Sequence, residues 1–63
     1  MMIYDFTIAY VLAGVHAEFD AAATSAGRAL EDLVRYVTTE LEQPSACIDQ
    51  PRVTNHGPSA IQF

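Results

Sequence analysis

The sequence predicts an α+β domain in which an antiparallel β-hairpin packs on one α-helix. Three observations support this fold class. Two successive stretches, residues 3–12 and 15–24, alternate apolar and polar side chains with a period of two. The next stretch, residues 25–43, repeats its apolar residues with the period of a helix. Prolines divide the remaining residues, 44–63, which we expect to be irregular with one or two short strands.

The two alternating stretches are mirror images about Ala13-Gly14. With these two residues as the turn, each apolar residue of the first stretch meets an apolar residue of the second, as in the pairs Leu12/Val15 and Ile8/Phe19. A slip of one residue would move one strand's apolar set to the wrong face. The pattern therefore predicts a register as well as a hairpin.

An alternative for residues 15–24 is a helix that begins near His16. Alanine is a strong helix former and a poor strand former, and this stretch is rich in it. The mirrored pairing nevertheless favours the strand, because it uses all ten positions of each stretch together.

The helix is expected to follow an N-cap at Thr24 or Ser25 and to stop at Gln43-Pro44. Glu31 and Arg35 have the spacing of a favourable ion pair. The expected core stripe consists of Leu30, Leu33, Val34, Val37 and Leu41.

Two short strands are candidates after the helix, at Arg52–Thr54 and at Ser59–Phe63. Between them, Asn55–Pro58 has the composition of a turn. In the second candidate strand, Ile61 and Phe63 would share one face. All 63 residues are expected to form one small domain.

The chain is acidic, with eight Asp and Glu residues against three arginines, no lysine and a net charge of −5. This charge argues against binding to nucleic acid or to an anionic membrane surface. It favours either a basic protein partner or no specific partner, the acids then serving solubility. A core this small also makes a homodimer plausible beside a monomer.

No targeting or membrane signal is evident. The chain starts without a basic region, and the uncharged run Phe6–Val15 is too short to cross a bilayer. Cys47 is the only cysteine, which excludes an internal disulfide and a cysteine-cluster zinc site. A lone thiol fits a reducing cytoplasm, so we expect a soluble, unprocessed cytoplasmic protein, with Cys47 as a small buried apolar residue.

The sequence carries no catalytic signature around its two histidines, His16 and His56. His16, Glu18 and Asp20 space three metal-ligand types along one strand, but a single strand gives poor closed geometry. We therefore expect no enzymatic activity, no metal and no cofactor.

The acids are the candidate partner-binding residues. In the predicted hairpin, Asp5, Glu18 and Asp20 project from the sheet face opposite the helix, where we expect no lysine and no arginine to neutralise them. A secondary group lies along the helix: Glu31, Asp32, Glu40 and Glu42. These carboxylates are suited to arginine side chains of a nucleic-acid-binding groove. Alternatively, they keep a solvated sheet face from aggregating.

The hairpin Tyr4–Thr24, the helix Ser25–Glu42 and these acids resemble the small anti-CRISPR proteins of bacteriophages, particularly inhibitors of type I surveillance complexes. The resemblance implies stoichiometric inhibition. The chain would act as a DNA mimic that occupies the DNA-binding or protospacer-adjacent-motif-reading surface of a basic Cas protein. The resemblance is architectural and has no motif to match residue by residue.

A different class also resembles the chain. Its strand-strand-helix order, with TSAGRALEDLVRYV opening the helix, is similar to the partial double-stranded-RNA-binding-like fold of HicB-type antitoxins. That resemblance implies neutralisation of a small basic toxin, although the DNA-binding segment usual in such antitoxins is missing here. A structural module without independent activity is the third alternative.

Overall fold

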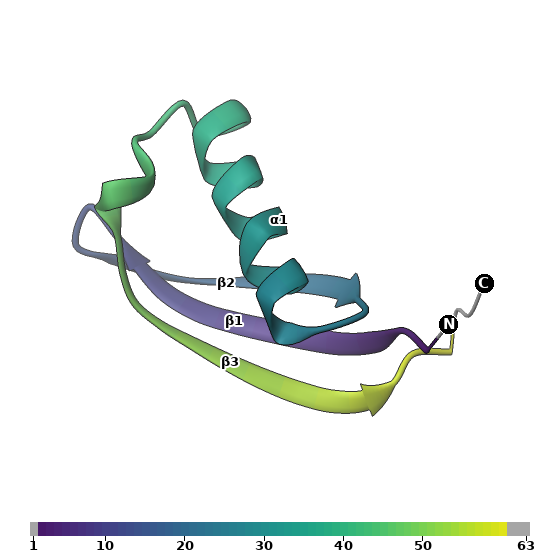
Figure 1. Cartoon of the computed structure of the whole chain (residues 1–63). Helices are drawn as coiled ribbons and strands as arrows, with labels where there is room; N and C mark the ends of the chain where they lie inside the picture. The colour runs from purple at the N-terminus through teal and green to yellow at the C-terminus, as the bar shows by residue number, and fades with distance from the viewer. Residues whose placement is uncertain (1, 61–63) are drawn as a thin grey trace.

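The computed structural model describes residues 2–60. Three strands and one long helix follow in the order β1 (Tyr4–Leu12), β2 (Val15–Ala23), α1 (Ala26–Thr39) and β3 (Ile48–Pro58). A short 3₁₀ turn, η1 (Ser45–Cys47), precedes β3. The strands form one antiparallel sheet in the order β2-β1-β3, and α1 lies across one face of it (Figure 1). The predicted α+β fold is confirmed.

The hairpin has the predicted register at every position. Leu12 pairs with Val15, Ile8 with Phe19, and Tyr4 with Ala23. The turn residues Ala13 and Gly14 have φ angles of 51° and 79°. Two successive positive φ values define the type I′ turn, whose twist matches that of the flanking strands. The alternative helix over residues 15–24 is not formed, because cross-strand pairing outweighs alanine's helix propensity.

The region after the helix differs from the expectation. A single strand, β3, runs the whole length of β1, where only short strands were predicted. Its ladder shifts register twice: Gln50 and Pro51 together face one residue of β1, and so do His56 and Gly57. These β-bulges allow the strand to continue through residues that sequence patterns assign to a turn.

The first of the two candidate C-terminal strands is confirmed, and most of the second lies outside the described residues. Arg52–Thr54 lies within β3, whereas Ser59 and Ala60 are not in a strand. The expectation for Ile61 and Phe63 lies outside the described residues.

The helix is shorter than predicted. It begins after Ser25, whose Oγ accepts a hydrogen bond from the Arg28 backbone N–H at 3.3 Å, so the predicted N-cap is confirmed. It ends at Thr39, four residues before the predicted stop at Gln43. Glu42 adopts a φ of 54°, and the backbone N–H groups of Leu41 and Gln43 donate to the Tyr36 and Val37 carbonyls at 3.3 and 3.0 Å. These local contacts close the last turn before Pro44 is reached.

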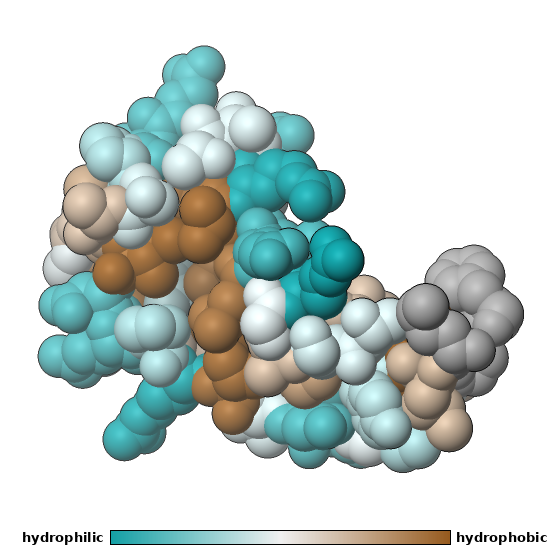
Figure 2. Space-filling model, viewed as in Figure 1, coloured by the Kyte–Doolittle hydropathy of each residue, from teal (hydrophilic) through white to brown (hydrophobic). Residues whose placement is uncertain are grey.

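The core lies between α1 and the inner face of the sheet. Of the predicted helix stripe, Leu33 and Val37 are buried and Leu30 is partly buried, whereas Val34 and Leu41 are exposed. Figure 2 shows a band of hydrophobic residues that runs from α1 down to the strands. Among residues 2–60, the buried apolar residues are Phe6, Ile8, Tyr10, Ala23, Ala29, Leu33 and Val37.

Within the described residues, no helix is long and apolar enough to cross a membrane. Cys47 was expected to be buried, but in η1 it is only half-buried.

Candidate functional site

The sheet face opposite α1, called the open face below, carries the three acids predicted as primary contacts. Side chains of a strand alternate between the two faces, and Ile8 and Tyr10 point into the core. The confirmed register therefore places Asp5, Glu18 and Asp20 together on the open face. All three are exposed.

The open face is less uniformly acidic than predicted, because β3 joins the sheet. Arg52 pairs with Ala9 and Asp49 pairs with Val11, so both belong to this face. The expectation that no arginine lies there is wrong. Pairing Arg52–Thr54 with the free edge of β1 would have revealed it from the sequence. Four carboxylates, those of Asp5, Glu18, Asp20 and Asp49, now share the face with one guanidinium.

A short hydrogen-bonded chain crosses the open face with one residue from each strand. The Thr7 hydroxyl donates to Asp20 Oδ1 at 2.8 Å, and Thr7 Oγ1 lies 2.7 Å from His56 Nε2. Since the single hydroxyl proton points to Asp20, Thr7 accepts from His56, whose Nε2 then carries a proton. His56 was expected in a turn; the bulge at Gly57 instead aims it at Thr7. The chain engages Oδ1 of Asp20, and the residue as a whole remains exposed.

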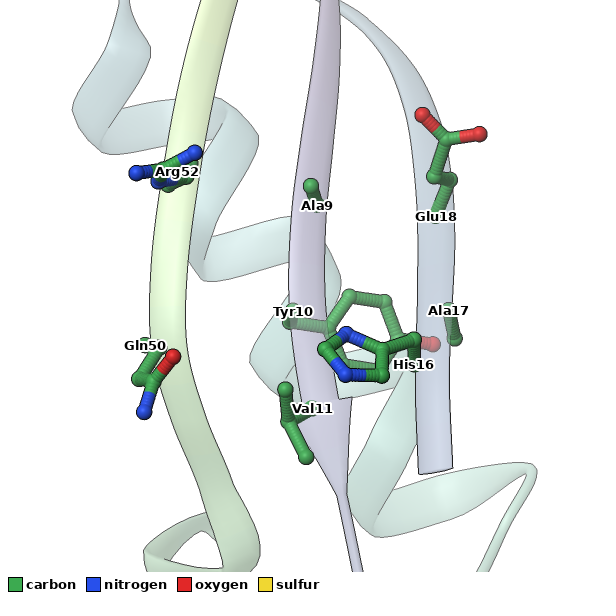
Figure 3. A pocket seen from close by; sticks show the side chains of 8 residues that line it. All are labelled: Ala9, Tyr10, Val11, His16, Ala17, Glu18, Gln50 and Arg52. Carbon is green, nitrogen blue, oxygen red and sulfur yellow. The ribbon is translucent and has the colours of Figure 1, made fainter. Parts of the chain in front are cut away.

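The open face is hollowed around Ala9, as Figure 3 shows. Arg52 and Gln50 of β3 stand on one side of the hollow, and Glu18 and His16 of β2 stand on the other. The small side chain of Ala9 forms the floor between the two sides. The hollow therefore has a carboxylate on one side and a guanidinium on the other. This mixture of charges does not identify it as a binding site for an anion or for a cation.

The secondary acids lie with α1, on the other side of the sheet from the open face. Glu31 pairs with Arg28 at 3.6 Å, and Asp32 pairs with Arg35 at 3.8 Å. The predicted pair between Glu31 and Arg35 is therefore replaced by two pairs at a spacing of three residues. Both are exposed and contribute little to stability.

A shallow groove runs between the free edge of β2 and α1 and brings together part of both acidic groups. Its apolar centre is Phe19 against Tyr36, with ring centroids 5.3 Å apart. Tyr36 is not among the residues of the predicted helix stripe, and its contact with Phe19 was not predicted. Glu31 and Glu42 do not line the groove. The residues that line this acidic groove are Phe19, Asp20, Ala21, Asp32, Arg35, Tyr36, Thr39 and Glu40.

Among the described residues, no three His, Cys, Asp or Glu side chains are close enough together to hold a metal ion. The interactions that the open face and the acidic groove offer are charge, hydrogen bonds from carboxylates, and aromatic contact at Phe19 and Tyr36.

Comparison of the chain with known protein families, with curated proteins and with solved structures found no match.

Proposed function

We propose that this chain is a small non-enzymatic inhibitor, similar to anti-CRISPR proteins, that binds a basic nucleic-acid-binding surface of a host defence complex. In this role its carboxylates take the place of nucleic-acid phosphates, so that target DNA or its recognition motif is excluded. The partner is a basic Cas protein, and both partners reside in the bacterial cytoplasm.

One observation carries the proposal: carboxylates converge along one side of the molecule. Glu18 and Asp20 stand on the open face of β2, and Asp32 and Glu40 flank the acidic groove on the other side of the same strand. The only cation in the groove lining, Arg35, is already paired with Asp32. A partner that approaches the β2 side therefore meets four acids, two on β2, one on α1 and one at the C-cap of α1.

The net charge of −5 supports the same conclusion. Carboxylates in this arrangement accept forked hydrogen bonds from arginine, and a field of one sign speeds the encounter with a partner of the opposite sign. Asp5, Glu31 and Glu42 contribute to that field from positions outside the groove lining.

The experiment measures inhibition of target-DNA binding by a type I Cas surveillance complex, titrated with the protein. The test variant combines Glu18→Gln with Asp20→Asn, which removes two charges while an amide oxygen still accepts from Thr7. We expect inhibition to weaken about 10-fold, with a shallower dependence on salt, because contacts with basic groups are lost.

A matched control removes two charges elsewhere. Glu31→Gln with Glu42→Gln gives the same net charge as the test variant, and we expect inhibition within about 2-fold of the unchanged protein. Equal inhibition by the two variants would show that only net charge matters, and full inhibition by the test variant would refute the mimic.

If the chain is an antitoxin, its partner is a small basic toxin. A second arm of the experiment tests this alternative. In that arm the protein is titrated against a small basic toxin of the kind that HicB-type antitoxins neutralise. Neutralisation of the toxin without inhibition of the Cas complex would replace the proposed function with the antitoxin one.

A further inference from the structure

The outer edge of β2 has unpaired backbone groups. In an antiparallel pair, successive residues point their N–H and C=O groups alternately toward and away from the partner strand. The turn hydrogen bond joins Leu12 to Val15, so Val15, Ala17, Phe19 and Ala21 point toward β1. The intervening residues His16, Glu18, Asp20 and Ala22 point their backbone groups outward, at an edge where residues 2–60 place no further strand.

This edge is regular enough to accept another strand. All nine residues of β2 pair with β1 without a shift, and the stretch contains no proline. The edge of β3 is different. It has two bulges, Pro51 and Pro58 lack an N–H, and Gln50 and Gly57 adopt positive φ angles. Of the two edges, only β2 offers an uninterrupted row of donors and acceptors.

Side chains of an added strand would find partners on both faces of β2. Residues opposite Glu18 and Asp20 would point to the open face, where these carboxylates stand. The intervening residues would point toward α1, into the acidic groove, against Phe19 and Tyr36. Basic residues alternating with apolar ones satisfy both faces.

The same charges disfavour a second copy of this chain in that position. In antiparallel self-pairing centred on Phe19, Glu18 of each copy stands opposite Asp20 of the other. Two bodies of net charge −5 also repel each other. The edge is therefore complementary to a basic strand and not to itself.

We infer that β2 binds an extended basic segment of the partner protein as a fourth, antiparallel strand. Backbone hydrogen bonds at His16, Glu18, Asp20 and Ala22 give this mode its geometry, and arginines opposite Glu18 and Asp20 give it selectivity. The inference rests on the proposed basic partner but specifies how that partner is held.

The probe is a short peptide of alternating arginine and valine, blocked at both ends and long enough to span His16–Ala22. Two further peptides carry the same charge and the same number of backbone N-methyl groups. In one the methyl groups are on arginines, whose N–H groups would pair with β2. In the other they are on valines, whose N–H groups would face away. Binding of all three to the unmodified protein is measured by calorimetry.

We expect the unmethylated and valine-methylated peptides to bind with similar affinity, and the arginine-methylated peptide at least about 10-fold more weakly. Equal binding of the two methylated peptides, or weaker binding of the valine-methylated one, overturns strand addition. A third outcome is that all three peptides bind the unmodified protein equally and do not bind the Glu18→Gln, Asp20→Asn variant. That outcome would support a basic partner but refute strand addition. If none binds, both fail.

Amide hydrogen exchange gives an independent readout on the same complex. Bound peptide should slow exchange at His16, Glu18, Asp20 and Ala22 by at least about 10-fold. The amide of Val53, which by the same alternation faces outward at the other edge, should exchange as before. Slowing at Val53 without slowing on β2 contradicts the inference.

Discussion

β2 and β3 pair with opposite sides of the same central strand, yet they end the sheet in different ways. β2 pairs with β1 at every residue, and the carboxylates of Glu18 and Asp20 protect its exposed edge from pairing with other strands. β3 follows β1 with two interruptions, and its exposed edge is guarded by bulges and prolines. Both devices prevent uncontrolled strand pairing.

These two kinds of protection against strand pairing are not equivalent. A proline or a bulge removes a donor or misplaces it, and so blocks every incoming strand alike. A carboxylate leaves the backbone intact and repels only a strand of like charge. An edge protected by charge can therefore still accept a strand of opposite charge, whereas an edge protected by prolines and bulges cannot accept any strand.

The largest expected effect comes from a change that removes the support of both edges at once. Ile8 is fully buried in β1 and pairs with Phe19 on one side and Val53 on the other. Ile8→Ala should cost about 3 kcal/mol of unfolding free energy, a large part of what a domain this small has. Chemical denaturation measures the loss. Amide exchange should show β2 and β3 losing protection together; survival of either ladder alone would show that the two edges are stabilised independently.

A smaller effect is expected from a change that affects only β3. Gly57 has a φ of 98°, and a Cβ built there meets nothing within 4 Å, so the cost of Gly57→Ala is that of the backbone alone. We expect a loss of about 1–2 kcal/mol with faster exchange in β3 and an unchanged hairpin. Gly27→Ala in the first turn of α1 is the control, since the same added methyl should there be neutral or stabilising. A loss of similar size in both variants would contradict the assignment of strain to the bulge.

The smallest effect is expected from a change in the turn that joins β1 to β2. Ala13 is held at a φ of 51°, where an L residue other than Asn, Asp or Gly is strained. Ala13→Asn creates the preferred Asn-Gly pair of a type I′ turn and should raise the unfolding free energy by about 0.5 kcal/mol. Thermal denaturation measures the gain. A decrease would indicate that the turn is not type I′ in solution.

The hairpin was predictable because its information is local and redundant. Ten mirrored positions specify one register, and the two-residue turn leaves no alternative loop length. The N-cap at Ser25 was predictable for the same reason, since an N-cap depends on residues three positions away.

β3 was not predictable to the same degree, because its continuity depends on a partner strand far away in sequence. Asn55 to Pro58 has the composition of a turn, and the Gly57 N–H does donate to Asn55 Oδ1 at 2.8 Å, but pairing with β1 on both sides of this contact makes it a bulge within a strand. Arg52 and His56 reach the open face through that long-range pairing. The acidic groove was missed likewise, since the contact between Phe19 and Tyr36 depends on how α1 crosses the sheet.

The central position of β1 has a consequence for synthesis. The strand that leaves the ribosome first is the one that both others must join, and the last to join, β3, is made after the entire helix. The hairpin joins neighbouring residues, so its pairing needs no later part of the chain, whereas β3 can pair with β1 only after its own residues have been made. Until then, the side of β1 that later pairs with β3 has no strand beside it.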